Sequence, residues 1–294
     1  MEYPTGVEWM TDLSGAAWIE DGLAEWKVSE SFPVGTVVPE GFEAYARVFH
    51  PVRPNSVHPL RWSAFADERG KVAHPAMEFE SLIETVDWQR PPWDELAPEW
   101  GCTPEAECRA LAEVLDAFTW TPDACWFALW DGYSLGFWPE DREVVRWPTR
   151  ADRRAIYSQE TLEREADRAR ELERIPTFGT LRGRRLDGSL SEPARTYYLL
   201  RGRLEAVLGF HFGGGRSPVR WRSPNLWWPD DHAWCVGCEV DGFTSFVGGT
   251  DQAITAVVGS PHLEAMRLDG DLRFRLGVDE INGPPPDLPV DPTG

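Results

Sequence analysis

The sequence predicts an α+β protein, with a mixed or antiparallel sheet, a few helices packed on it, many loops and a tryptophan-rich core. Strand-like and helix-like segments alternate irregularly along the chain, which disfavours a doubly wound parallel sheet. The chain has 26 glycines and 25 prolines among 294 residues, which is typical of a loop-rich globule. Its 16 tryptophans supply bulky side chains for core packing.

Three segments of the first half carry the clearest patterns. Residues 42–50 (FEAYARVFH) alternate apolar and polar side chains, which predicts a half-buried strand that ends at Pro51. Residues 103–119 predict a helix with Thr103 as N-cap, Pro104 in its first turn and an apolar stripe from Leu111 to Phe118. Residues 125–130 (CWFALW) are apolar on both faces, as in a strand in the middle of a sheet.

Later segments predict further elements. Residues 158–174 form a charged pattern with a thin apolar stripe, which predicts a solvated helix. Residues 196–200 and 234–240 predict strands, and residues 251–258 predict a helix capped by Thr250. We divide the chain into an N-terminal α+β part (1–176), a C-terminal α+β part (177–281) and a disordered tail (282–294). The first two parts can also form one continuous domain.

Charge restricts the partners that the protein can take. The formal net charge is −20 at pH 7, and a field this negative repels phosphate backbones, so we expect no nucleic-acid binding. We find neither a signal-peptide pattern nor an apolar run long enough for a membrane span, and so expect no membrane binding. The five cysteines suit free thiols in a reducing compartment. These features predict a cytoplasmic protein.

Three stretches of the chain carry a family resemblance. They are residues 42–51 (FEAYARVFHP), 125–132 (CWFALWDG) and 223–236 (SPNLWWPDDHAWCV), the last followed by residues 246–249 (FVGG). They resemble a family of uncharacterised actinobacterial proteins of this length. The resemblance implies a cytoplasmic bacterial protein and assigns no catalytic residue.

Residues 132–136 (GYSLG) have the spacing of a serine nucleophile elbow around Ser134. The strand before the serine is present, but Pro139 opposes the helix that should follow it. A triad of Ser134 with Asp230 or Asp231 and with His232 or His262 is the hydrolase interpretation. The alternative is that Asp131, Gly132 and Gly136 are turn residues at the end of a buried strand.

Cys235 and Cys238 have the CxxC spacing of redox and zinc sites. In a strand, however, residues three apart point to opposite faces, so these thiols would not share a metal. Cys102 and Cys108 also lack zinc-ribbon spacing. We therefore expect structural burial of the cysteines, no metal site and no cofactor.

Residues 225–234 (NLWWPDDHAW) hold the densest local chemistry of the chain. Asp230, Asp231 and His232 can bind a cation or exchange protons, and Trp227 and Trp228 can line a binding groove. The alternative is a structural turn in which the aspartates hydrogen-bond to nearby backbone while the two indoles cover the core.

An arginine-rich stretch interrupts the acidic sequence. It includes Arg216, Arg220 and Arg222, with Arg182, Arg184 and Arg185 earlier in the chain and three glycines directly before Arg216. Arginine forks and exposed glycine N–H groups bind phosphate or carboxylate, so this loop is a candidate site for a small anionic ligand. The alternative is a solvated loop attracted to the acidic remainder of the protein.

No group of residues in the sequence forms a convincing catalytic set. We therefore predict a non-catalytic cytoplasmic binding or interaction protein whose acidic surface favours a basic protein partner, in the manner of an antitoxin or immunity protein. The predicted binding residues are Trp227, Trp228, Asp230, Asp231, His232, Arg216, Arg220 and Arg222. The alternative is a hydrolase that uses Ser134 or the Asp230/Asp231/His232 cluster.

Overall fold

The computed structural model describes residues 4–24, 32–53, 58–83, 96–133, 172, 174–180, 195–214, 217–268, 273–274 and 279–283. Its α-helices are α1 (Ala17–Gly22), α2 (Trp62–Asp67), α4 (Glu105–Leu115) and α7 (Asp251–Gly259). Its 3₁₀ helices are η1 (Ser14–Ala16), η2 (Val34–Thr36), η3 (Phe79–Leu82), η4 (Asp116–Phe118) and η5 (Leu204–Gly209). Its strands are β1 (Val7–Trp9), β2 (Phe32–Pro33), β3 (Ala44–Phe49), β4 (Cys125–Trp130), β5 (Thr177–Thr180), β6 (Arg195–Gly202), β7 (His211–Gly214), β8 (Ser217–Trp221), β9 (Leu226–Pro229), β10 (Trp234–Cys238), β11 (Thr244–Gly249), β12 (Ala265–Leu268) and β13 (Arg273–Phe274).

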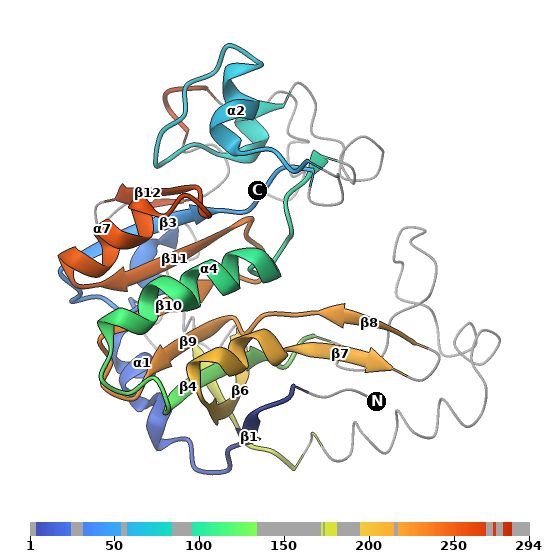
Figure 1. The fold of residues 1–294 in the computed structure, drawn as a ribbon, viewed down its shortest axis with the longest axis vertical. Coiled ribbons are helices and arrows are strands. Elements are labelled where there is room, and N and C mark those ends of the chain that lie inside the picture. Colours follow the sequence, from blue (N-terminus) through green and yellow to red (C-terminus); the bar gives the residue numbers. More distant parts are fainter. Residues whose placement is uncertain are drawn as a thin grey trace, which may run out of the picture.

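One nine-stranded sheet organises the protein (Figure 1). The strand order is β1-β6-β4-β9-β10-β11-β3-β12, β5 also pairs with β6, and all of these pairings are antiparallel. Helices α4 and α7 lie across one face and α1 lies on the other. The predicted α+β class with an antiparallel sheet is confirmed, and strands from both sides of residue 176 share this sheet.

The strand predicted over residues 42–50 is confirmed, but the expectation that it is half-buried is wrong. Strand β3 occupies this segment between β11 and β12, and all six of its residues are buried. Tyr45, on the side expected to face solvent, belongs to the core under α1. Arg47, on the same side, donates from its guanidinium to the backbone carbonyls of Pro75 and Met77 at 2.9 and 3.0 Å. The strand is therefore covered on both faces by segments distant in sequence.

The central strand over residues 125–130 is confirmed as β4, which pairs with β6 on one side and β9 on the other. The expected strands over 196–200 and 234–240 correspond to β6 and β10. The helix over 251–258 is α7, and the Thr250 hydroxyl accepts a hydrogen bond from the Ala253 N–H at 3.2 Å, as an N-cap should. The expected helix over 158–174 lies almost entirely outside the described residues.

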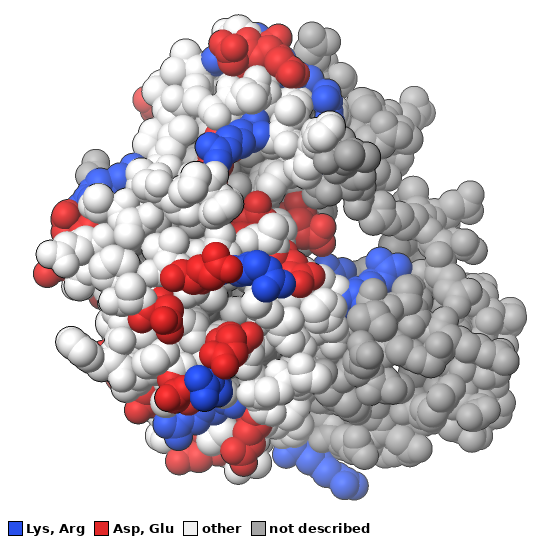
Figure 2. Space-filling view, viewed as in Figure 1, with Lys and Arg blue, Asp and Glu red and all other residues white. Residues whose placement is uncertain are grey.

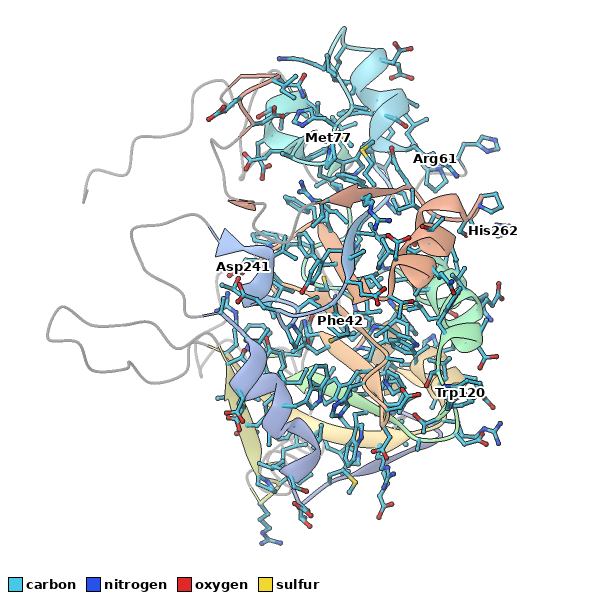
Figure 3. The ribbon with its side chains drawn as sticks, turned by 90° about the vertical axis from the view of Figure 1, so that its left-hand side faces the viewer. Phe42, Arg61, Met77, Trp120, Asp241 and His262 are labelled. Atoms are coloured by element: carbon cyan, nitrogen blue, oxygen red, sulfur yellow. The ribbon has the colours of Figure 1, made fainter. Side chains whose placement is uncertain are left out.

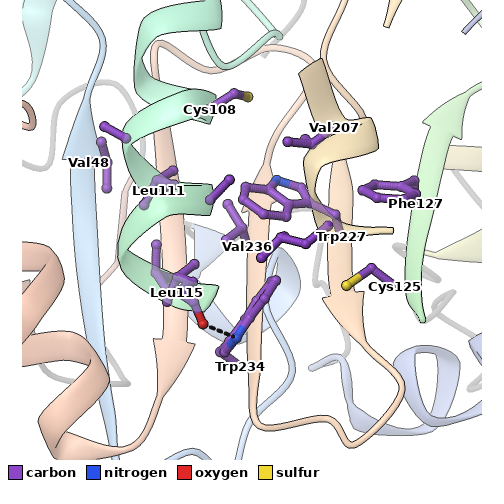
Figure 4. Packing of buried hydrophobic residues seen from close by; sticks show 14 of the residues in the cluster. Val48, Cys108, Leu111, Leu115, Cys125, Phe127, Val207, Trp227, Trp234 and Val236 are labelled. Atoms are coloured by element: carbon purple, nitrogen blue, oxygen red, sulfur yellow. Dashed lines mark hydrogen bonds between the residues drawn. The ribbon is translucent and has the colours of Figure 1, made fainter. Parts of the chain in front are cut away.

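Helix α4 begins later than the sequence predicts. Pro104 is its N-cap, and the Thr103 hydroxyl lies 2.7 Å from the Ser245 hydroxyl instead of capping the helix. The apolar face of α4 packs against the core that Figure 4 shows in close view. In this core the indole N–H of Trp234 donates to the Leu115 carbonyl at 3.1 Å, which satisfies one carbonyl at the C-terminal end of α4.

A smaller lobe that contains α2 and η3 lies beyond the β12 side of the sheet (Figure 1). Its own aromatic core joins the sheet through Phe49 and Phe243. Residues 279–282 are bound to this lobe. Asp279 accepts hydrogen bonds from the His74 ring and from the Glu78 N–H. The Asn282 side chain accepts a hydrogen bond from the Val72 N–H and donates one to the Val72 carbonyl. Asn282, expected at the start of a disordered tail, therefore belongs to the folded part.

Among the described residues we find no helix that combines the length and the apolar character needed to cross a membrane.

Candidate functional site

The two adjacent indoles of the 225–234 segment are buried. Trp227 and Trp228 lie on β9, and because neighbouring strand residues point to opposite faces, their side chains enter two different cores. Trp227 packs in the core beneath α4, with its ring 5.3 Å from that of Trp234. Trp228 packs in the core beneath α1. Their role as ligand-binding residues stays a prediction.

The segment directly after β9 forms a tight turn. The His232 N–H donates to the Pro229 carbonyl at 3.0 Å, and Asp231 Oδ1 accepts from the Ala233 N–H at 3.1 Å. His232 has a φ of +54°, a left-handed backbone conformation that side-chain-bearing residues adopt uncommonly. The local hydrogen bonds hold this conformation and present the side chains of Asp230, Asp231 and His232 outside the sheet.

Asp231 joins this turn to a second one, which follows α4 and η4. Its Oδ2 accepts from the Trp120 N–H at 2.7 Å, and both carboxylate oxygens lie 2.9 Å from the Thr119 hydroxyl, which donates to them. In return the Asp231 N–H donates to the Thr121 hydroxyl at 3.1 Å. The two turns, more than 100 residues apart in sequence, therefore form one hydrogen-bonded unit.

Trp120 is presented on this unit with its side chain in solvent. Its relative exposure is 95%, the highest of the exposed large hydrophobic residues in the described part of the chain. Figure 3 shows Trp120 at the outer edge of the molecule, beyond the end of α4. The backbone N–H of Trp120 is fixed by Asp231, whereas its indole packs against nothing in the core. A large apolar side chain is thus held in water at a defined position.

Asp230 forms a second group with Trp126 and Arg201. Asp230 Oδ1 accepts from the indole N–H of Trp126 at 2.8 Å, and the Arg201 guanidinium lies 3.7 Å from the same oxygen. The guanidinium carbon is also 4.8 Å from the centre of the Trp126 ring, within the range of a cation–π contact. An arginine, an indole and a carboxylate therefore contact one another in this group.

His232 stacks on Trp18, an α1 residue from the other end of the chain. The ring centroids are 4.2 Å apart and the planes are inclined by 16°. Partial burial lowers the pKa of His232, and the neighbouring Asp230 and Asp231 oppose that shift. Partial burial against Trp18 therefore favours the neutral imidazole over the charged one.

Four aspartates lie near Cys125 at the start of β4. Burial raises the pKa of the Cys125 thiol to about 12, with further contributions from Asp231, Asp116, Asp123 and Asp230, so all four carboxylates lie near that thiol. Asp230 pairs with Arg201, and Asp123 with Arg203 at 2.8 Å. Asp116 makes no ion pair within the described part of the chain. We call Trp120 with Asp116, Asp123, Asp230 and Asp231 the Trp120 patch.

Acidic side chains do not form one continuous field on the face that Figure 2 shows. Acidic and basic groups neighbour one another there (Figure 2). On α4, the Arg109 guanidinium lies 3.3 Å from Glu105 Oε1. The Trp120 patch combines four carboxylates, two neighbouring arginines and an exposed indole, which distinguishes it from a charge cluster alone.

Arg222, one of the predicted anion-binding arginines, lies apart from the Trp120 patch. Arg222 lies before β9 and Asp230 after it, so the two residues are at opposite ends of the strand. The Arg222 guanidinium lies 3.4 Å from Glu99 Oε1 and 5.5 Å from the centre of the Tyr133 ring. Arg220 is on β8, in the hairpin that Figure 1 shows extending from the sheet. Arg182, Arg184, Arg185 and Arg216 lie outside the described residues.

The hydrolase residues are only partly described. Ser134 lies outside the described residues. Asp131 and Gly132 form a turn directly after β4. His262 lies in the segment after α7, well away from Trp120 in Figure 3. In the Asp230/Asp231/His232 cluster both carboxylates accept the hydrogen bonds described above, and the imidazole stacks on Trp18. The use of either set in catalysis stays a prediction.

A serine–histidine contact that sequence reasoning missed lies inside the protein. His50 Nε2 is 2.8 Å from the Ser245 hydroxyl, and His50 Nδ1 is 2.9 Å from the Glu99 backbone oxygen. Because a carbonyl only accepts, Nδ1 carries the proton and Nε2 accepts from the serine. Both side chains are fully buried, and burial lowers the pKa of His50 to about 4. This contact ties β3 to β11.

The cysteines are all buried free thiols. Cys235 belongs to the core under α1, whereas the thiol of Cys238 lies near those of Cys102 and Cys108 on the α4 side. The CxxC cysteines thus point to opposite faces, as strand geometry predicts. In the part of the chain that is described, no three His, Cys, Asp or Glu side chains form a group that could hold a metal ion.

The fold and the site define only a class: an α+β protein with a nine-stranded antiparallel sheet and an exposed tryptophan on a turn that an aspartate fixes. No protein-family model matches the chain, and no curated protein and no solved structure is significantly similar to it. The resemblance to an actinobacterial family stays a prediction.

Proposed function

We propose that this protein is a non-catalytic interaction protein that binds a basic protein partner through the Trp120 patch. The observation that carries the proposal is the 95% exposure of Trp120 on a turn fixed by Asp231. Tryptophan is among the residues that most often dominate binding energy in protein interfaces. A backbone ordered before binding reduces the entropy lost on association.

The charge around Trp120 supports a basic partner. Asp231 fixes the backbone of Trp120, Asp116 and Asp230 lie near Cys125 at the start of β4, and the protein as a whole has a formal net charge of −20. Complementary charge speeds the encounter of two proteins and selects against acidic competitors. The role of an antitoxin or immunity protein that neutralises a basic target in the cytoplasm is consistent with this charge, and it is part of the same proposal.

The test is affinity capture with the full chain as bait at low salt. We compare the wild type with Trp120→Ala and with the control variant Trp100→Ala. Trp100 precedes the N-terminal end of α4, and its side chain is 48% exposed. We expect a basic protein that the wild type and Trp100→Ala retain and that Trp120→Ala loses. Its association rate should fall as salt is raised, because salt screens exposed charges.

Two results contradict the proposal. The first is that the wild type and Trp120→Ala retain the same proteins in the same amounts. The second is that the association rate of the captured protein is independent of salt. A screen of the purified chain with ester and phosphate substrates addresses the hydrolase alternative in parallel, and turnover that Ser134→Ala abolishes would support an enzyme instead.

A further inference from the structure

A group of residues next to the Trp120 patch shows how the patch can bind. Arg201 lies over the ring of Trp126 while its guanidinium approaches Asp230, and Asp230 also accepts the indole N–H of Trp126. The Trp126 residue is only 7% exposed. At this position the protein thus surrounds one of its own guanidinium groups with an indole face and a carboxylate.

The neighbouring residue Asp231 repeats part of this arrangement. It accepts a hydrogen bond from Trp120, here from the backbone N–H. No arginine of the described residues covers Trp120, whose indole is almost wholly in solvent. The second position therefore has an exposed indole and a neighbouring carboxylate but lacks the guanidinium.

We propose that the Trp120 patch binds an arginine side chain of the partner, with the guanidinium over the Trp120 indole and directed toward Asp231. This inference rests on the proposed function and names the chemistry that the patch selects. A planar guanidinium stacks on an aromatic face and pairs with a carboxylate through its fork of N–H groups. A lysine ammonium is a compact, strongly hydrated charge that fits this combination less well.

The experiment compares two probes of equal charge. One is an acetylated and amidated pentapeptide of three glycines and two arginines, and the other replaces both arginines with lysine. Each is titrated at low salt into the full-length ¹⁵N-labelled protein. The indole N–H resonance of Trp120, assigned as the one missing from Trp120→Phe, reports binding at this residue. Asp116→Asn tests the contribution of the patch charge.

We expect the arginine peptide to bind roughly two- to fivefold more tightly than the lysine peptide, the size of an exposed cation–π contact. In Trp120→Ala, followed through the backbone resonances of residues 116–124, the two peptides should bind equally. Trp100→Ala should keep the wild-type ratio. Equal affinities in the wild type, or an unchanged ratio in Trp120→Ala, would overturn the arginine assignment alone. If neither peptide shifts the Trp120 indole resonance, and Asp116→Asn leaves both titrations unchanged, the proposed binding of a basic partner is contradicted as well.

Discussion

The carboxylate of Asp231 accepts the backbone N–H of Trp120 at 2.7 Å. This contact joins the turn after β9 to the turn after η4, across 111 positions of sequence. It fixes the backbone that carries an indole exposed to solvent. The interaction proposed for this protein depends on that fixed position, since a mobile tryptophan would lose more entropy on binding.

Removing the Asp231 carboxylate should destabilise the protein moderately. Asp231→Ala deletes the acceptor for Trp120, Thr119 and Ala233, and the expected loss in free energy of unfolding is about 1–2 kcal/mol, because these bonds are partly exposed to water. Urea unfolding measures the change. Asp116→Ala, which breaks no ion pair within the described residues, is the control and should stay within about 0.5 kcal/mol of the wild type. Equal stabilities of the two variants would contradict the structural role of Asp231.

Ionisation of the buried Glu107 carboxyl should lower the free energy of unfolding at high pH. Burial raises the pKa of this carboxyl on α4 to about 7. Between pH 4.5 and 7 the folded state therefore binds more protons than the unfolded state, and the free energy of unfolding falls as pH rises. Glu107→Gln removes this penalty. We expect the variant to exceed the wild type by about 1–3 kcal/mol at pH 8, with a smaller difference at pH 5.

The control for Glu107 is Glu113→Gln, on the same helix with an exposed side chain. Urea unfolding of all three proteins at pH 5 and pH 8 separates the pH effect from any general effect of the amide. A Glu107→Gln protein that is less stable than the wild type at both pH values would show that the buried carboxylate makes favourable contacts instead.

His50 should produce the opposite pH dependence. Its pKa is lowered from 6.5 to about 4 by burial, so between these values the unfolded state binds more protons than the folded state. The free energy of unfolding should rise with pH across this window, by about 3 kcal/mol at most for this residue. NMR titration of the His50 ring should show a neutral imidazole down to about pH 5. Protonation of His50 near pH 6.5 in the folded protein would contradict the buried contact with Ser245.

Gly237, in the middle of β10, should not tolerate a side chain. A Cβ at this position would lie 2.6 Å from the carbonyl oxygen of Val37, the residue directly after η2. This oxygen belongs to the backbone and cannot move independently of η2. Gly237→Ala should therefore lower the free energy of unfolding by about 1–3 kcal/mol. Gly259→Ala, at the end of α7 with open space around the position, is the matched control and should be neutral or slightly stabilising. Equal thermal unfolding of the two variants would contradict the packing of β10 against η2.

Local pattern was sufficient to predict several elements. The central strand β4 followed from an apolar run with turn residues on both sides, and the Thr250 cap of α7 followed from its position before a helical stripe. Prediction failed where distant segments decide the environment. Arg47 alternates with apolar neighbours and was expected in solvent, but the α2 lobe supplies carbonyls for its guanidinium. No feature of residues 42–50 encodes that lobe.

The candidate site shows the same limit. Sequence reasoning selected Asp230, Asp231 and His232, and offered a structural turn as the alternative to a binding site. It did not select Trp120, the residue on which the proposed function depends. A local signal exists, because Trp120 falls outside the apolar stripe from Leu111 to Phe118 and lies between two threonines directly before Pro122. Its fixed backbone could not be predicted, since Asp231 contributes it from 111 positions away.

Oxidative footprinting of Trp120 in the complex tests the central claim most directly. The full-length protein is exposed to hydroxyl radicals with and without the captured partner, and mass spectrometry gives the oxidation rate of each tryptophan. The account predicts that Trp120 oxidises fast in the free protein and is protected at least severalfold when the partner is bound, while Trp100 changes little. A Trp120 that oxidises equally fast in the saturated complex would contradict the proposed interface.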